Sequence, residues 1–182
     1  MPKDHAVEAQ VSKPEKELLC LSKNGLRIVY DPVNSHAATH LEDTPQLKDL
    51  LTEAIGNMEL DGQEIKTHVD MGRTVGTCDV VEVDDSDEIV YAMRKNREDD
   101  GLVPFTKTRV AEPSSSVAMH LVPQPNGSYE LSSAWIGVFE EDLPFPQAKD
   151  ATEQSADYWS HYAFVWGSQE IVAGTVTSAR PW

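Results

Sequence analysis

The chain has 182 residues, and its 31 Asp and Glu against 15 Lys and Arg give a formal net charge of -16. Hydrophobic residues make up 40% of the sequence and include four Trp, five Tyr and four Phe, which is enough to build a core and excludes a wholly disordered chain. No apolar run is long enough to span a membrane, and the first residues lack the apolar stretch of a secretory signal, so we expect a cytoplasmic protein with no membrane partner. The two cysteines are too few for a disulfide framework or a four-cysteine zinc site.

The N-terminal third of the sequence predicts a tail, a strand and a helix. Residues 1–20 predict a mobile tail, because polar and charged side chains follow one another there without a period. Residues 26–30 predict a short strand that an Asp-Pro step brings to an end. Thr44 is a good N-cap, Pro45 suits the first helical position, and leucines recur at helical spacing after it, which together predict a helix over 44–55.

From residue 65 onward the sequence is typical of β-structure. Residues 75–83 and 88–93 predict one hairpin around an acidic turn, and residues 105–110 predict a half-exposed strand. Residues 116–136 predict a second hairpin that turns at Asn126-Gly127.

These elements predict a single α+β domain over residues 21–182. Its core would be a twisted antiparallel β-sheet of about four to five strands, within residues 65–140, packed by an N-terminal helix. Residues 155–182 are rich in aromatic side chains, which predicts a segment docked on the sheet.

The charge is unevenly distributed along the chain. Residues 94–109 carry five of the fifteen cations and three carboxylates, for a local net charge of +2. The rest of the chain would repel nucleic acid, so any contact with a polyanion would use this patch. Alternatively, these cations pair with the surrounding carboxylates on a solvated surface.

Several kinds of catalytic and metal site are missing from the sequence. It has no glycine-rich phosphate loop and no GxSxG elbow. His36 and His40 have the i, i+4 spacing that lets two imidazoles share a metal on a helix. The Glu of a zinc protease is absent, however, and Asp31-Pro32 disfavours a long helix at this point. We therefore predict no metal site and no cofactor.

The segment Lys66–Arg73 joins a histidine, an aspartate and an arginine in one short stretch. A metal-independent ribonuclease needs a general base, a general acid and a cation that stabilises the charged transition state. His68 and one of the arginines at positions 73, 94, 97 and 109 could supply two of those roles. Alternatively, His68 caps a loop and Arg73 pairs with an aspartate.

The order of the elements, with Ser133-Ala134-Trp135-Ile136-Gly137 closing the second hairpin, resembles the barnase–EndoU–colicin–RelE type of ribonuclease and toxin fold over roughly residues 44–140. This resemblance implies a catalytic site made of His68, Arg94, Thr108 and Ser133. RNA would then bind through the basic patch, with substrate-binding cations at Arg73, Arg97, Lys107 and Arg109. The chain departs from the family in its strong negative charge, since toxins that act on RNA are usually basic.

A second hypothesis explains the charge directly. A non-enzymatic, acidic protein-interaction module, similar to an immunity protein or antitoxin, would find a basic protein partner through electrostatic steering. An enzyme should gather His68 with arginines and hydroxyls in one concave site, whereas a binding module should show an exposed carboxylate surface.

Overall fold

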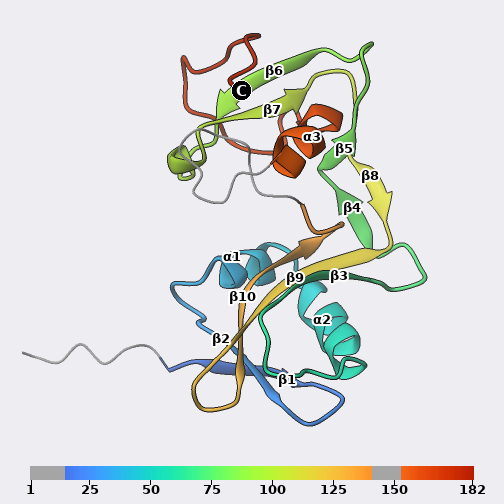
Figure 1. Cartoon of the computed structure of the whole chain (residues 1–182), viewed down its shortest axis with the longest axis vertical. Helices are drawn as coiled ribbons and strands as arrows, with labels where there is room; N and C mark the ends of the chain where they lie inside the picture. Colours follow the sequence, from blue (N-terminus) through green and yellow to red (C-terminus); the bar gives the residue numbers. More distant parts are fainter. Residues whose placement is uncertain (1–14, 141–152) are drawn as a thin grey trace, which may run out of the picture. The chain divides into compact units, whose positions relative to one another are not determined.

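The computed structural model describes residues 15–140 and 153–182, and Figure 1 shows their course. These residues form three α-helices and eleven strands in three sheets, of five, four and two strands. The predicted α+β class is confirmed. The predicted arrangement around one sheet of four to five strands is wrong, because the strands divide among three sheets and two of them precede the first helix, which is therefore not N-terminal. No helix in the described part of the chain is long and apolar enough to cross a membrane.

Contacts along the chain divide it into two compact units. Unit 1 consists of residues 1–65 and 120–134, and unit 2 of residues 66–119 and 135–182. The chain passes between the units within strands β3 (Ile65–Asp70), β9 (Ser116–Pro123) and β10 (Tyr129–Ile136). These strands continue through the division, and the single domain over residues 21–182 stays a prediction.

The five-stranded sheet has the order β1-β2-β10-β9-β3. Strand β1 (Glu17–Leu21) occupies positions that the sequence assigned to a mobile tail, of which residues 1–14 lie outside the described part. It forms because its Leu19 and Cys20 are buried and its backbone pairs antiparallel with β2 (Arg27–Tyr30). On its other side β2 pairs parallel with β10, so the expectation of a purely antiparallel sheet is wrong here.

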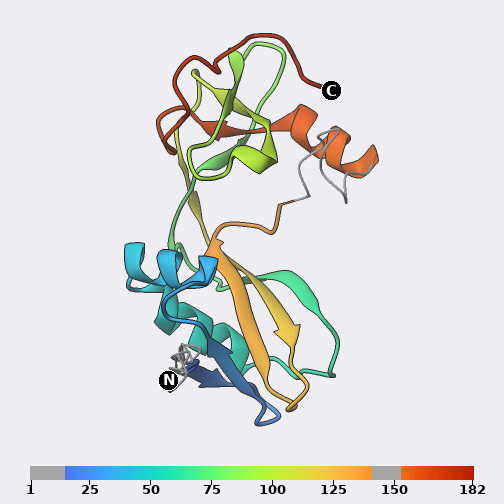
Figure 2. The same cartoon turned by 90° about the vertical axis from the view of Figure 1, so that its left-hand side faces the viewer.

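Two consecutive helices, α1 (His36–Asp43) and α2 (Leu47–Gly56), follow β2 in unit 1. The helix expected over 44–55 is α2, and Thr44 is the C-cap of α1 instead of an N-cap. Helix α2 contacts β1 (Figures 1 and 2). Five apolar side chains on one face of α2 are buried, as the helical spacing predicts: Leu47, Leu50, Leu51, Ala54 and Ile55.

The hairpin of β9 and β10 agrees with the sequence in its limits and in its turn. Gly127 has a φ of +84°, a conformation that glycine adopts without the steric cost of a side chain. The turn closes with a hydrogen bond from the Gln124 N–H to the Ser128 carbonyl, 2.8 Å long. Tyr129 is buried at the start of β10, where its hydroxyl accepts from the Gly62 N–H and donates to the Gln63 carbonyl.

The four-stranded sheet of unit 2 has the order β5-β11-β7-β6. Strand β6 (Ile89–Met93) pairs antiparallel with β7 (Leu102–Thr106), so the hairpin predicted between residues 75–83 and 88–93 is wrong. Residues 75–83 instead contain two short strands in different sheets, β4 (Gly76–Cys78), paired with β8 (Glu112–Ser114), and β5 (Val80–Glu82), paired with β11 (Tyr162–Val165).

Aromatic side chains from the C-terminal part of the chain complete the core of unit 2. Helix α3 (Glu153–His161) leads directly into β11 (Figure 2), and these two elements bury Trp159 and Phe164. Both pack with residues of β6 and β7, and Trp182 packs against the same cluster. The Trp182 ring meets Tyr91 edge-to-face with 5.5 Å between centroids. The last residues of the chain are therefore held by packing.

Candidate functional site

Arg94, which the sequence places at the centre of a ribonuclease site, is a buried member of an ion-pair cluster. Its side chain is only 8% exposed, and its Nη2 donates to Asp100 Oδ2 over 2.6 Å. Its guanidinium lies over the Phe164 ring, 4.7 Å from the centroid. Burial lowers the pKa of Arg94, and the charge of Asp100 opposes that shift. This arginine is thus engaged with protein groups, because burial and the ion pair both direct it away from solvent.

Arg97 and Glu140 complete the electrostatic surroundings of Arg94. Arg97 Nε donates to the same Asp100 carboxylate at 2.9 Å, so one aspartate holds two arginines. Burial raises the pKa of Glu140 to about 7, although the charges of Arg94 and Arg97 oppose the shift. Two cations and two carboxyl groups therefore interact in this cluster.

Thr108 and Arg109 belong to a second ion-pair cluster, centred on Asp87. The Thr108 hydroxyl donates to Asp87 Oδ1 at 2.7 Å, and Arg109 Nε donates to the same oxygen at 2.8 Å. Arg109 Nη2 also reaches Asp84 Oδ2 at 3.1 Å. Hydrogen bonds from the Arg109 guanidinium, from the Asp84 backbone N–H at 2.8 Å and from the Thr108 hydroxyl hold the pKa of Asp87 well below its usual range. The acidic turn that the sequence shows before β6 therefore serves as the anchor of Arg109.

His68 and Ser133 lie apart from both ion-pair clusters in the described contacts. His68 is exposed on β3, and its Nδ1 accepts a hydrogen bond of 3.2 Å from the Phe139 N–H. A neutral ring that accepts at Nδ1 carries its proton on Nε2. Ser133 is half-buried on the unit 1 part of β10. Within the described residues, no hydrogen bond or ion pair joins His68 to Arg94 or to Thr108.

The remaining predicted substrate-binding cations also contact protein groups. Arg73 is exposed, and its Nη1 lies 3.4 Å from the Met71 carbonyl oxygen. Lys107 Nζ lies 3.9 Å from Glu88 and 4.9 Å from the centroid of the Trp166 ring. The sequence offered pairing with surrounding carboxylates as an alternative, but it did not identify the individual partners. Only the i, i+3 spacing of Arg97 and Asp100 could have suggested one of these pairs.

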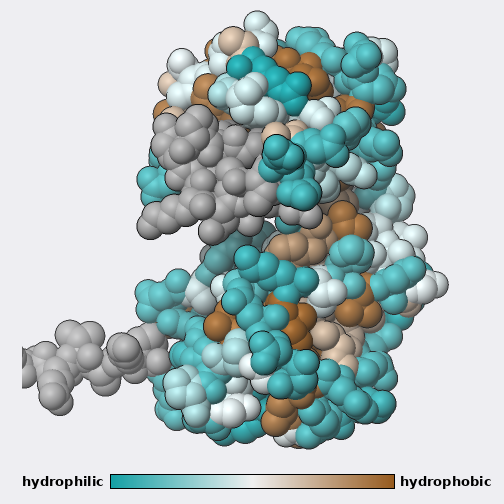
Figure 3. Space-filling model, viewed as in Figure 1, coloured by the Kyte–Doolittle hydropathy of each residue, from teal (hydrophilic) through white to brown (hydrophobic). Residues whose placement is uncertain are grey.

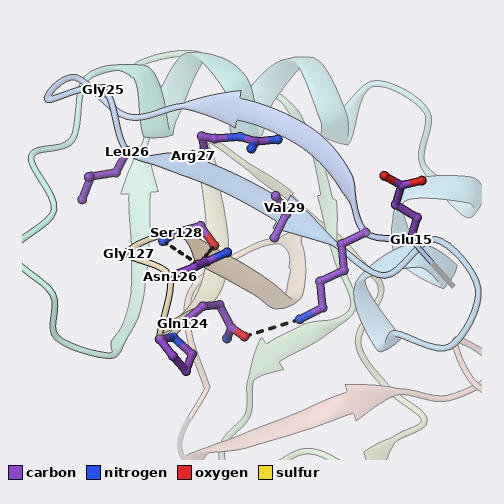
Figure 4. Close-up of a pocket in the computed structure, with 11 residues that line it drawn as sticks. Glu15, Gly25, Leu26, Arg27, Val29, Gln124, Asn126, Gly127 and Ser128 are labelled. Carbon is purple, nitrogen blue, oxygen red and sulfur yellow. Dashed lines mark hydrogen bonds between the residues drawn. The ribbon is translucent and has the colours of Figure 1, made fainter. Parts of the chain in front are cut away.

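Each unit has a hollow that the described residues line. The unit 1 hollow, about 620 Å³, lies between the turn before β2 and the turn of the β9–β10 hairpin (Figure 4). Asn126 Oδ1 there accepts from both the N–H and the hydroxyl of Ser128, so these groups satisfy one another. The unit 2 hollow, about 420 Å³, has Lys95, Trp166 and Glu170 in its wall, and Lys95 pairs with Glu170 at 3.4 Å. Neither hollow gathers the predicted catalytic residues.

Both units expose carboxylates, and unit 1 contains one segment in which they greatly outnumber the cations. Residues 42–64, here called the acidic segment, carry seven acidic residues and one basic residue, Lys48. All seven acidic residues are exposed. Glu59 pairs with Lys23 at 3.0 Å, Glu64 pairs with His120 at 2.6 Å, and Asp61 accepts a hydrogen bond from the Gln63 N–H at 3.1 Å. Hydrophilic residues also dominate the face of the molecule drawn in Figure 3.

Neither the two thiols nor any group of metal-ligating side chains among the described residues adds a candidate catalytic centre. Burial raises the pKa of Cys20 to about 11 and also raises the pKa of Cys78, so neither thiol forms a ready thiolate. Among residues 15–140 and 153–182, no three or more His, Cys, Asp and Glu side chains are grouped so that they could hold a metal ion.

Comparison with known proteins found no matching family model, no matching curated protein and no matching solved structure. The resemblance to the barnase–EndoU–colicin–RelE type of fold therefore stays a prediction.

Proposed function

We propose that the chain is a non-enzymatic, acidic module that binds a basic protein partner. The observation that supports this proposal is that the cations of the basic patch form ion pairs with carboxylates of the same chain. Every cation within residues 94–109 contacts a carboxylate of this chain: Arg94 and Arg97 contact Asp100, Lys95 contacts Glu170, Lys107 contacts Glu88, and Arg109 contacts Asp84 and Asp87. The patch that would have to receive RNA is thus occupied by internal ion pairs.

The acidic segment offers the complementary feature that a basic partner would need. Its carboxylates are exposed, and they outnumber its cations by seven to one. A surface of one sign accelerates encounter with a partner of the opposite sign and suppresses encounter with one of the same sign. A net charge of -16 therefore favours a cationic protein and disfavours a nucleic acid.

The test uses two charge-matched triple variants. One neutralises the acidic segment through Glu42→Gln, Asp43→Asn and Asp49→Asn, and the other neutralises exposed carboxylates of unit 2 through Glu82→Gln, Asp85→Asn and Glu112→Gln. A basic protein retained by the wild-type chain from its host would be purified and titrated by calorimetry. We expect the first variant to weaken binding at least about tenfold and the second to change it little. Equal losses in both variants would mean that net charge alone attracts the protein, and would contradict a specific site.

The ribonuclease hypothesis has its own test, because the exposed imidazole of His68 could still act on RNA. RNA would be incubated with the purified chain in the presence of EDTA. Cleavage that falls about 10²–10⁴-fold in His68→Ala, and that persists in a matched His161→Ala control, would replace the binding module with an enzyme. We expect no cleavage by any of the three proteins.

A further inference from the structure

Helix α1 brings two histidines together at the start of unit 1's helical pair. Ser35 is its N-cap, since the Ser35 hydroxyl oxygen accepts from the Ala38 N–H at 3.0 Å. The same hydroxyl donates to the Asp31 carbonyl at 2.6 Å. The helix therefore begins at His36, beyond the Asp-Pro step that disfavours a helix. This start places His36 and His40 one turn apart on the same face.

The side chains of the two histidines converge on one point. Their Nε2 atoms lie 2.9 Å apart, and their rings meet edge-to-face with 4.5 Å between centroids and 81° between planes. His36 is exposed and His40 is half-buried, so solvent reaches the pair. One ring donates to the other through this contact, and each neutral ring can instead carry its proton on Nδ1 and present an Nε2 lone pair.

The separation of the two nitrogens is closer to one coordination geometry than to another. Bonds of about 2.0–2.1 Å from one metal ion to two imidazole nitrogens at 90° place those nitrogens about 2.9 Å apart, and a tetrahedral angle would need about 3.3 Å. The 2.9 Å observed between the Nε2 atoms matches the right angle. Cis positions of a square-planar or tetragonal ion are typical of Cu²⁺ and Ni²⁺ with nitrogen and oxygen ligands.

We propose that His36 and His40 form a two-nitrogen binding site for a tetragonal divalent transition-metal ion, with Cu²⁺ bound most strongly. The order of affinity should be Cu²⁺ above Ni²⁺ and Zn²⁺, with no binding of Mg²⁺, because imidazole prefers the later transition metals. Among the described residues, no third His, Cys, Asp or Glu joins the pair, so water would complete the coordination of the ion. The site does not depend on the proposed binding of a basic protein.

The experiment titrates the full chain with Cu²⁺ and follows both the heat of binding and the broadening of backbone amide signals in nuclear magnetic resonance. We expect one ion per chain, with broadening centred on residues 31–44, because the paramagnetic ion acts only on nearby nuclei. His36→Gln and His40→Gln should each lower the association constant at least about tenfold. His161→Gln, which removes an exposed histidine that has no second histidine one turn away, should leave it unchanged.

A spacing variant separates chelation from the mere presence of two histidines. His40→Gln combined with Glu42→His keeps the number of histidines in α1 but turns the second ring about 120° away from the first around the helix. We expect this variant to bind as weakly as His40→Gln, with far-ultraviolet circular dichroism showing that the fold is kept. Wild-type affinity in the spacing variant, unchanged affinity in His36→Gln, or broadening centred away from residues 31–44 would each overturn the proposal.

Discussion

Asp87 shows how a single side chain decides what the basic residues of unit 2 can do. Its side chain is 4% exposed and accepts hydrogen bonds from Arg109 and Thr108. The sequence showed Asp87 as one of four polar residues in a turn and showed Thr108 and Arg109 on a strand twenty residues later. Pairing across that distance depends on the register of β6 with β7, which no local pattern in the sequence specifies.

The shifted pKa of Asp87 predicts a pH-dependent loss of stability in Asp87→Asn. Because the folded-state pKa lies below the ordinary value of 3.8, the charged carboxylate stabilises the fold above that pH, and this contribution is lost as the pH falls through the lower folded-state pKa. We expect the variant to have a lower free energy of unfolding at pH 7 and a smaller deficit at pH 3, both measured by urea denaturation. Asp85→Asn, an exposed neighbour in the same turn, is the control and should show little loss at either pH. A deficit in Asp87→Asn that is the same at both pH values would contradict this account.

The elements that local patterns define were predictable, and those that depend on partners were not. Helix α2 and the β9–β10 hairpin have strong local signals, in the leucine spacing of one and the Asn-Gly turn of the other. Strand β1 is stabilised by pairing with β2, and α1 by the cap that Ser35 supplies after an Asp-Pro turn. The parallel pairs β2–β10 and β7–β11 join segments far apart in sequence, so period and propensity could not assign them.

The packing of helix α2 leads to a prediction about the free energy of unfolding. Leu51 is fully buried on the helix face that meets the sheet, so Leu51→Ala should lower the free energy of unfolding by about 2–5 kcal/mol. Leu18 on β1 is 47% exposed, and Leu18→Ala is the matched control, with an expected loss of less than about 1 kcal/mol. Both values can be measured by chemical denaturation at pH 7. Equal losses for the two leucines would mean that α2 does not contribute its apolar face to the core.

In the candidate site, as in the fold, local features could be predicted from the sequence and long-range contacts could not. The sequence shows which cations, hydroxyls and histidine the chain contains, but it does not show which of them contact one another. Their grouping follows from tertiary structure, which directs the arginines to Asp87 and Asp100. The His36–His40 pair is the converse case, because its spacing was visible in the sequence but the start of α1 and the convergence of the two rings were not.

At the scale of the whole molecule, the net charge of -16 predicts that salt stabilises this protein. Like charges repel one another in the compact state, and raising the ionic strength from about 0.01 M to 0.15 M shortens the screening length from about 30 Å to about 8 Å. The ion pairs of the Asp87 and Asp100 clusters are short and partly shielded from solvent, so salt should weaken them less than it weakens long-range repulsion. We therefore expect the thermal unfolding midpoint to rise over this range of sodium chloride.

The variant Glu42→Gln, Asp43→Asn, Asp49→Asn tests where that repulsion originates. Removing three exposed negative charges from the acidic segment should raise the midpoint at low salt and reduce the further gain on adding salt, because less repulsion is left to screen. Lys48→Gln removes the one cation of the same segment and should act in the opposite direction, with a lower midpoint at low salt and a larger gain on adding salt. Both can be measured by calorimetry in matched buffers. If added salt instead lowers the midpoint of the wild-type chain, the internal ion pairs outweigh the repulsion, and the acidic segment does not carry the excess of unbalanced charge that the binding proposal requires.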